Sequence, residues 1–196
     1  MIVYHRPGAG RPIRIVWMLE EVGAPYELRI MTTEEAAGGE HRARHPLGRV
    51  PVLEYDEGML FESTALCLHT ADLHPSAGLV PPVGTRDRAL VYQWAFFAMT
   101  EIEPPAIQAY RLRESAPEVA ESAAKRLDAS VAVIEETLQG REYLVGDGFT
   151  VADVIASEVV RILVRLDLME PQGAIAEYLT LMEARPARQR AAAKFA

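Results

Sequence analysis

Residues 45–53 read HPLGRVPVL and residues 61–65 read FESTA, and the fold is decided by these two stretches. Pro51 stands near the start of an apolar run, residues 50–55, that has the composition of a strand. Proline removes a backbone donor from a strand, so its presence there needs a reason. A cis peptide bond before Pro51 supplies one, because it turns the neighbouring backbone outward. The N–H and C=O of Val50 are then available to pair with an extended, peptide-like ligand.

The second stretch closes a predicted hairpin and opens a helix. Residues 56–58, Asp-Glu-Gly, separate two short apolar runs, which is typical of a hairpin turn. Ser63 can N-cap the helix that follows, which is predicted to run to about His74. A helix N-terminus favours a carboxylate, and Glu62 can accept a hydrogen bond from an ammonium group. The pattern therefore predicts a ligand with a peptide backbone, a carboxylate and an amine, as in the γ-glutamyl end of glutathione.

Each stretch alone has an ordinary explanation, since Val-Pro is common in turns and Glu-Ser is a common helix cap. The pattern around them gives them weight. Residues 2–4 form a short apolar run, and residues 13–22 have helical spacing that Gly23 can end. Residues 26–30 alternate between apolar and charged side chains, as in a half-buried strand. The predicted order is βαβ followed by ββα, with the first two strands parallel.

The character of the chain changes after this α/β half. Residues 75–84 contain three prolines and two glycines, which indicates a linker. Residues 86–103 are rich in helix formers, and the prolines at 104–105 are expected to stop or kink that helix. Thr150 and Asp153 predict the capped start of a buried helix. The predicted domains are 1–76 (α/β), a linker at 77–85, and an all-α domain at 86–196.

Composition excludes several classes of function. The formal net charge of −8 argues against a nucleic-acid partner, which would require a basic surface. No apolar stretch approaches the ~20 residues that span a bilayer, and the N-terminal apolar run is too short for a signal peptide. The single cysteine, Cys67, permits no intrachain disulfide, which fits a cytoplasmic protein; we expect it to be buried and inert. The five histidines lack metal-ligand spacing, so no metal is predicted.

Four segments together resemble one family. Residues 46–53 resemble its N-P-x-G-K/R-V-P-x-L segment, with His45 where Asn is usual, and residues 62–66 resemble its E-S-x-A-I segment. Residues 14–27 are similar to its first helix and second strand, and residues 149–153 to the capping segment of its buried helix. Over nearly its full length the chain resembles the cytosolic glutathione transferase superfamily, of the bacterial type. The resemblance implies a thioredoxin-like N-terminal domain and an all-helical C-terminal domain.

The resemblance also implies roles for particular residues. Arg49, Val50 and Pro51 would hold the cysteinyl part of glutathione, and Glu62 and Ser63 would hold the γ-glutamyl part. Glutathione would be the co-substrate, and its thiolate would attack a small, apolar, electrophilic substrate, as in detoxification. The family usually forms homodimers, so a homodimer is implied too.

The family's thiol-activating side chain, a Ser, Cys or Tyr, lies between the first strand and the first helix. Here that loop, residues 6–12, reads RPGAGRP, and Gly10 falls where the serine-type members carry the hydroxyl. Three substitutes remain open. The Arg11 cation can favour the thiolate, and so can backbone N–H groups of residues 8–10. Tyr4 can donate its hydroxyl, although it stands about one residue out of register with the tyrosine-type members.

The helical half offers candidates for a pocket that would take the second substrate, namely Phe97, Glu101 and Tyr110. The missing hydroxyl keeps an alternative open, a non-catalytic glutathione-binding or protein-interaction member of the same fold. A glutathione-dependent isomerase or dehalogenase is a third option, for which the sequence has no dedicated motif.

Overall fold

The computed structural model describes residues 1–195. By their internal contacts, these residues form two compact units. The first contains Met1–Leu79 together with the segment that begins at Arg185, and the second contains Val80–Ala184. The break after Leu79 lies within the predicted linker, residues 77–85. The segment from Arg185 onward, assigned above to the helical half, groups instead with the first unit because it packs against that unit's first helix.

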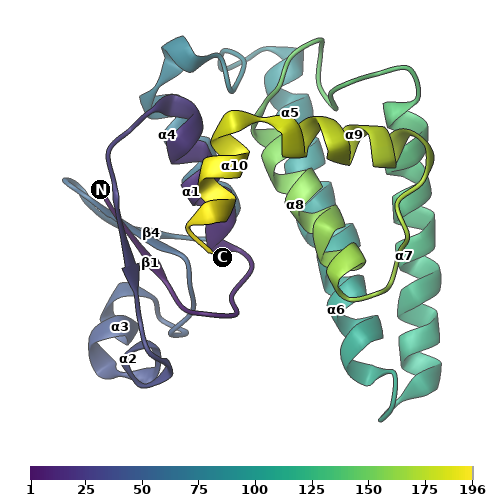
Figure 1. Ribbon diagram of the computed structural model, residues 1–196, viewed down its shortest axis with the longest axis horizontal. Coiled ribbons are helices and arrows are strands. Elements are labelled where there is room, and N and C mark those ends of the chain that lie inside the picture. The colour runs from purple at the N-terminus through teal and green to yellow at the C-terminus, as the bar shows by residue number, and fades with distance from the viewer. Residues whose placement is uncertain (196) are drawn as a thin grey trace. The chain divides into compact units, whose positions relative to one another are not determined.

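A four-stranded mixed sheet forms the centre of the first unit (Figure 1). Its strands lie in the order β2-β1-β3-β4. β1 pairs parallel with β2 and antiparallel with β3, and β3 pairs antiparallel with β4. The bounds are β1 (Ile2–His5), β2 (Glu27–Ile30), β3 (Val52–Tyr55) and β4 (Gly58–Phe61). The predicted βαβ–ββα order is thereby confirmed, including the parallel first pair and the hairpin.

Two longer helices of this unit, α1 (Pro12–Val22) and α4 (Ser63–Leu73), pack against each other (Figure 1). α1 ends at Gly23, which takes the left-handed conformation with φ 65°, as predicted. Eight consecutive residues of α1, from Pro12 to Leu19, are buried. A short 3-10 helix, η1 (Pro75–Ala77), follows α4. α1 also contacts β1, and α4 contacts β4, so both helices pack on the sheet.

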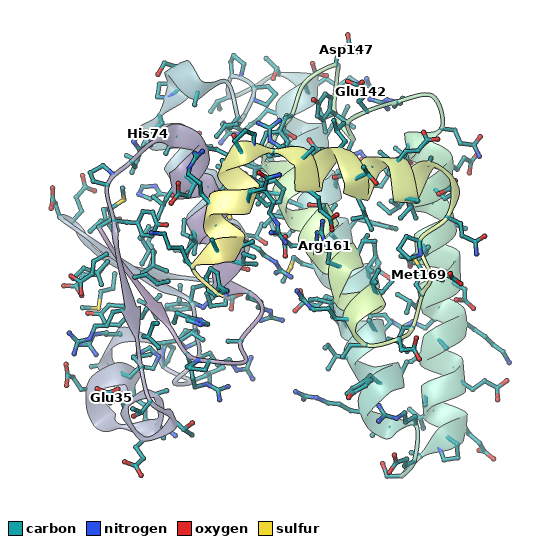
Figure 2. All side chains as sticks on the ribbon, viewed as in Figure 1. Glu35, His74, Glu142, Asp147, Arg161 and Met169 are labelled. Atoms are coloured by element: carbon teal, nitrogen blue, oxygen red, sulfur yellow. The ribbon has the colours of Figure 1, made fainter. Side chains whose placement is uncertain are left out.

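Two short helices that the sequence analysis did not predict lie between β2 and β3. They are α2 (Thr33–Ala37) and α3 (Gly39–Arg44). Thr32 caps α2, because its hydroxyl accepts from the Glu35 N–H at 3.1 Å and the Glu35 carboxylate accepts from the Thr32 N–H at 2.7 Å (Glu35 is labelled in Figure 2). A Thr-x-x-Glu spacing is the signature of such a capping box, so the sequence did carry a signal for α2.

The last described helix, α10 (Pro186–Ala193), packs against α1. Arg185 donates through Nε and Nη2 to the two carboxylate oxygens of Glu21, at 2.7 and 2.9 Å. Arg190 donates through Nε to the Glu20 carboxylate at 2.7 Å. The first of these pairs has the two-pronged geometry that makes arginine–carboxylate contacts strong. Ion pairs therefore fasten α10 to the first helix of the chain.

The second unit is helical, as predicted, and no helix within residues 1–195 is both long enough and apolar enough to span a membrane. Pro104 and Pro105 lie in the first turn of α6 (Glu103–Leu112), and a π-helical segment directly precedes them. The helix therefore does not stop at these prolines, and its irregular part is the π-helical segment before them. The elements are α5 (Arg86–Phe97), η2 (Ala98–Ile102), α6 (Glu103–Leu112), α7 (Pro117–Leu138), α8 (Val151–Arg165) and α9 (Gly173–Ala184).

The helix α8 is the core of this unit, and Asp153 fixes its start. Thr150 is the N-cap residue, and its backbone N–H and its hydroxyl both donate to Asp153 Oδ2, at 2.8 and 3.1 Å. Asp153 Oδ1 accepts from the Leu144 N–H at 3.0 Å and from the Tyr178 hydroxyl at 3.1 Å. Asp153 is fully buried. The predicted cap is confirmed, and it also ties the preceding loop and α9 to α8.

Candidate functional site

Three segments of the first unit meet at one end of the strands. Tyr4 on β1 lies opposite Val52 on β3, and Val52 lies opposite Phe61 on β4. The loop after β1, the residues before β3 and the residues after β4 therefore leave the sheet at the same end of the strands. Because the register is fixed by pairing, Pro51 and Glu62, which flank the Val52–Phe61 pair, are neighbours. Residues 45–53 and residues 61–65 are thus brought together.

The peptide bond between Val50 and Pro51 is cis, as predicted. Pro51 is buried, whereas Arg49 is exposed. The side chain of Val50 packs on a small cluster on the α2 side of the sheet, formed by Tyr4, Met31, Ala36 and Val52. This packing of the partly buried Val50 side chain fixes the main chain of Val50 at the start of β3.

The loop before Val50 approaches α2 closely. Gly48 has φ +60°, and a Cβ at this position would lie 3.0 Å from the carbonyl oxygen of Ala36. Both observations favour glycine, because other residues rarely adopt this conformation and a methyl group would need the backbone to move. The loop therefore has one defined path from α3 to Pro51.

Glu62 has an unusual backbone conformation, with φ 71° and ψ 105°. Among residues 1–195, only Glu62 and Asp167 are non-glycine residues with positive φ. Such a conformation costs on the order of 1–3 kcal/mol and is concentrated at binding and active sites. The Glu62 side chain is exposed, and its carbonyl accepts from the Leu66 N–H at 3.0 Å. Glu62 therefore places an exposed carboxylate next to Pro51.

Ser63 differs from its prediction by one position. The N-cap of α4 is Glu62, and Ser63 is the first helical residue, with a side chain that is only 1% exposed. Its hydroxyl accepts from Nη1 of Arg14 at 3.2 Å. Arg14 lies on α1 and is fully buried, so a cation stands behind the N-terminus of α4. Sequence reasoning did not single out Arg14; a lone arginine within the buried run of α1 was the available signal.

The loop at residues 6–12 forms a tight turn before α1. Gly8 has φ +80°, and the Ala9 N–H donates to the Arg6 carbonyl at 3.1 Å. This bond occupies one of the three backbone N–H groups considered above for the thiol. Gly10 is exposed, and Arg11 is half-buried at the N-cap position of α1. No acidic residue lies in the first turn of α1, so the positive end of its dipole is not offset there.

The contacts of the Tyr4 side chain lie on the α2 side of the sheet and not at the start of α1. Its hydroxyl donates to the Glu54 carboxylate at 2.6 Å, and the guanidinium of Arg44 lies 4.6 Å from its ring centre. Burial and the hydrogen bond to Glu54 raise the pKa of Tyr4 above its ordinary value. Since the hydroxyl already donates its one proton to Glu54, these contacts favour a structural role for Tyr4 over thiol activation.

Cys67 is fully buried on α4, as expected, and burial raises the pKa of its thiol to about 12. The thiol therefore stays protonated at neutral pH and is a poor nucleophile. Within the part of the chain that the structure describes, no group of three or more His, Cys, Asp or Glu side chains is placed to hold a metal ion.

The three pocket candidates lie on consecutive helical segments of the second unit. Phe97 is the last residue of α5, half-buried, with its ring 5.6 Å from that of Trp94. Glu101 follows in η2 and is exposed. Tyr110 is half-buried on α6, and Arg113 covers one face of its ring at 4.1 Å. The first two residues lie about one turn apart, and Tyr110 is on the next helix.

Comparison with known proteins connects this arrangement to a family. The family model described as "Glutathione S-transferase, N-terminal domain" matches residues 1–72, and "Glutathione S-transferase, C-terminal domain" matches residues 89–186. Glutathione S-transferase 4 of Zea mays is 29% identical over 192 residues, which cover 91% of this chain and 86% of the relative. An elongation factor 1-gamma of Trypanosoma cruzi is 33% identical over 137 residues, 68% of this chain but only 32% of that protein.

Solved structures with a similar fold belong to the same family. A glutathione transferase from Methylococcus capsulatus str. Bath is 30% identical, with a TM-score of 0.89 over 99% of this chain and 98% of that one. A sphingomonad glutathione S-transferase complexed with glutathione is 25% identical, with a TM-score of 0.83 over 100% of this chain and 98% of that one. The matches extend through both units, and the resemblance inferred from the sequence is confirmed. This chain belongs to the glutathione S-transferase family.

Proposed function

We propose that this protein binds glutathione at the end of the sheet formed by Val50, Pro51 and Glu62, and that it transfers the glutathione thiolate to small, apolar electrophiles. The observation that carries the proposal is the juxtaposition of the cis-Pro51 backbone with Glu62 at the start of α4. A solved relative holds glutathione within the same fold, which supports this ligand. Residues 1–76 are then the glutathione-binding domain, residues 77–85 are the linker, and the helical domain begins at residue 86; the segment from Arg185 onward packs with the first unit.

In this proposal the peptide part of glutathione lies along the backbone of Val50. The N–H and C=O of Val50, which precede the first residues of β3, pair with the backbone of the cysteinyl residue, while Arg49 and Pro51 flank it. The γ-glutamyl ammonium group donates to the exposed Glu62 carboxylate. The γ-glutamyl carboxylate meets the N-terminus of α4 at Ser63, where the helix dipole and the buried Arg14 cation both favour negative charge. These contacts orient the sulfur toward the start of α1.

Activation of the thiol is assigned to the start of α1. A free thiol is mostly protonated at neutral pH, since its pKa is about 8.5. The Arg11 guanidinium and the uncompensated positive end of α1 both favour the thiolate. The Gly10 N–H is a further donor candidate, whereas Ala9 already donates within the turn. We assign the second-substrate pocket to Phe97, Glu101 and Tyr110, and we propose a cytoplasmic homodimer with a role in detoxification, which family membership supports.

Calorimetry with glutathione and conjugation of a chloronitroaromatic test the two halves of this proposal separately. Binding accompanied by a conjugation rate above background supports a transferase. Binding without conjugation supports the alternative, a non-catalytic glutathione-binding member. The hydroxyl-free loop favours this alternative, and the chain is also similar to an elongation factor 1-gamma. Absence of binding refutes both.

Glu62→Gln is expected to weaken glutathione binding by about tenfold, because a charge-assisted hydrogen bond contributes about 1.5–3 kcal/mol. Glutamine keeps the length of the side chain but removes its charge. Titration calorimetry measures the effect, and Glu57→Gln, at the exposed hairpin turn, is the matched control. Normal affinity in the Glu62 variant would refute the assignment of the γ-glutamyl site.

Arg11→Ala is expected to raise the pKa of the bound glutathione thiol by about one unit, because a nearby cation favours the thiolate. The conjugation rate then falls by up to about tenfold near pH 6.5 and is nearly unchanged near pH 9, where the thiol ionises by itself. The pH profile of kcat measures the shift, with Arg6→Ala in the same loop as the control. An unchanged profile removes Arg11 from the mechanism.

A further inference from the structure

We propose that His41 and His45 are positioning residues that hold the glutathione-binding loop, and that His45 does so as an uncharged imidazole, so that protonation of His45 releases the loop and weakens binding. This inference rests on the proposed function, because residues 45–51 are the segment assigned to the cysteinyl part of glutathione. Neither histidine contacts the ligand in this proposal. Their role is to fix the backbone that does.

His45 closes the turn that begins the loop. The Leu47 N–H donates to Nδ1 of His45 at 3.1 Å, and the Gly48 N–H donates to the His45 carbonyl at 2.8 Å. Because Nδ1 accepts a backbone proton, it cannot carry one itself, and the ring proton must be on Nε2. An imidazolium carries protons on both nitrogens and has no acceptor. Protonation of His45 therefore breaks the bond to Leu47 and sets two N–H groups against each other.

His41 anchors the other end of the loop. It lies on α3, is fully buried, and places Nε2 at 2.9 Å from the carbonyl oxygen of Arg49. A carbonyl oxygen only accepts, so Nε2 of His41 carries the proton and donates. That carbonyl belongs to the peptide group between Arg49 and Val50, directly before the cis bond to Pro51. Thus one histidine fixes the start of the loop and the other fixes the residue that precedes the ligand-pairing backbone.

The surroundings of His45 keep its ring uncharged at neutral pH. The ring is 4% exposed and lies against Phe61, with ring centres 4.6 Å apart. Burial lowers the pKa of His45 below its ordinary value of 6.5, and His41 and Arg49 reinforce this effect, while Glu62 and the backbone of His45 oppose it. The uncharged form is therefore the form present at neutral pH. The loop bond is lost only as the pH falls below 6.5, through the lowered pKa.

A titration with S-methylglutathione isolates this effect, since its sulfur cannot ionise. Between about pH 7 and pH 5 its carboxylates stay charged and its amine stays protonated. We expect calorimetry to show an affinity that falls as the pH drops through the lowered pKa of His45, with a total loss of about fivefold or more once the ring is protonated, the loss that one hydrogen bond implies. The change is expected to follow a single protonation.

Two variants separate the contact from the charge. Oδ1 of an asparagine can accept from the N–H two residues ahead, as Nδ1 of His45 does, and it does not titrate. We therefore expect His45→Asn to bind within about twofold of the wild type near pH 7 and to keep that affinity near pH 5. His45→Ala is expected to bind weakly at both pH values. His74→Asn, at the far end of α4, is the control and should keep the wild-type profile (His74 is labelled in Figure 2).

The possible failures are distinguishable. If wild type and His45→Asn lose affinity equally between neutral and acid pH, the role of His45 is refuted while the proposed function stands. If neither protein binds S-methylglutathione at neutral pH, the proposed function fails and this inference fails with it. Nitrogen NMR of the imidazole provides a check that needs no ligand. At neutral pH it should show Nδ1 of His45 unprotonated, and a proton on that nitrogen would overturn the proposal.

Discussion

Replacement of Gly10 by serine is expected to increase the rate of glutathione conjugation by up to about tenfold near pH 6.5, where a free thiol with a pKa of about 8.5 is only about 1% ionised. A hydroxyl that donates to the sulfur favours the thiolate, and each unit by which the thiol pKa falls raises the thiolate fraction about tenfold. The backbone of residue 10 does not require glycine. Gly10 is exposed, and it is not among the described glycines with positive φ.

Gly10→Ala is the matched control, because it adds the Cβ without the hydroxyl. The conjugation rate of a chloronitroaromatic across pH, and the ultraviolet absorbance of the bound thiolate, measure the effect. Equal rates for the serine and alanine variants would show that residue 10 does not face the sulfur. A wild-type protein whose bound thiol already ionises near pH 6.5 would show that Arg11 and the start of α1 activate the thiol without a hydroxyl at residue 10.

Asp153→Ala is expected to lower the free energy of unfolding by about 3–5 kcal/mol, the range of the largest single-residue effects. The variant removes the acceptor for the backbone N–H groups of Leu144 and Thr150 and for the Tyr178 hydroxyl. Each buried donor left without a partner costs about 1–3 kcal/mol. For a chain of this size the expected fall in Tm is about 10 °C, at about 2–4 °C per kcal/mol.

Thermal denaturation followed by circular dichroism measures the loss. Asp153→Asn is expected to lie between alanine and wild type, since its amide oxygen still accepts but its amide nitrogen opposes one of the N–H groups. Asp128→Ala, at an exposed position on α7, should leave Tm unchanged. A fall of less than about 1 kcal/mol for Asp153→Ala would show that solvent replaces the carboxylate.

Local signals were sufficient to predict much of the first unit. The alternation at residues 26–30 predicted β2, and the Asp-Glu-Gly turn predicted the hairpin of β3 and β4. Pro51 predicted the cis bond, because a proline at that point of a strand needs an explanation. Each of these signals acts over a few residues, which is the range at which sequence patterns are informative.

The predictions failed where a contact joins distant residues or where two caps compete. Ser63 resembled an N-cap, but Glu62 takes that place with positive φ, and the serine hydroxyl turns toward Arg14 instead. Ser63 and Arg14 are 49 positions apart, so no local pattern contains their bond. The bond between His41 and Arg49 was missed for a related reason. It depends on α3, a helix that the sequence analysis did not predict.

The ion pairs between α1 and α10 have a consequence for the order in which the protein forms on the ribosome. Glu21 emerges early in synthesis, and its partner Arg185 follows 164 residues later. The whole second unit, Val80–Ala184, is made in between. Domains fold as units during synthesis, so the helical unit can assemble while α1 still lacks its last neighbour. The first unit is therefore completed only after the second unit has been synthesised.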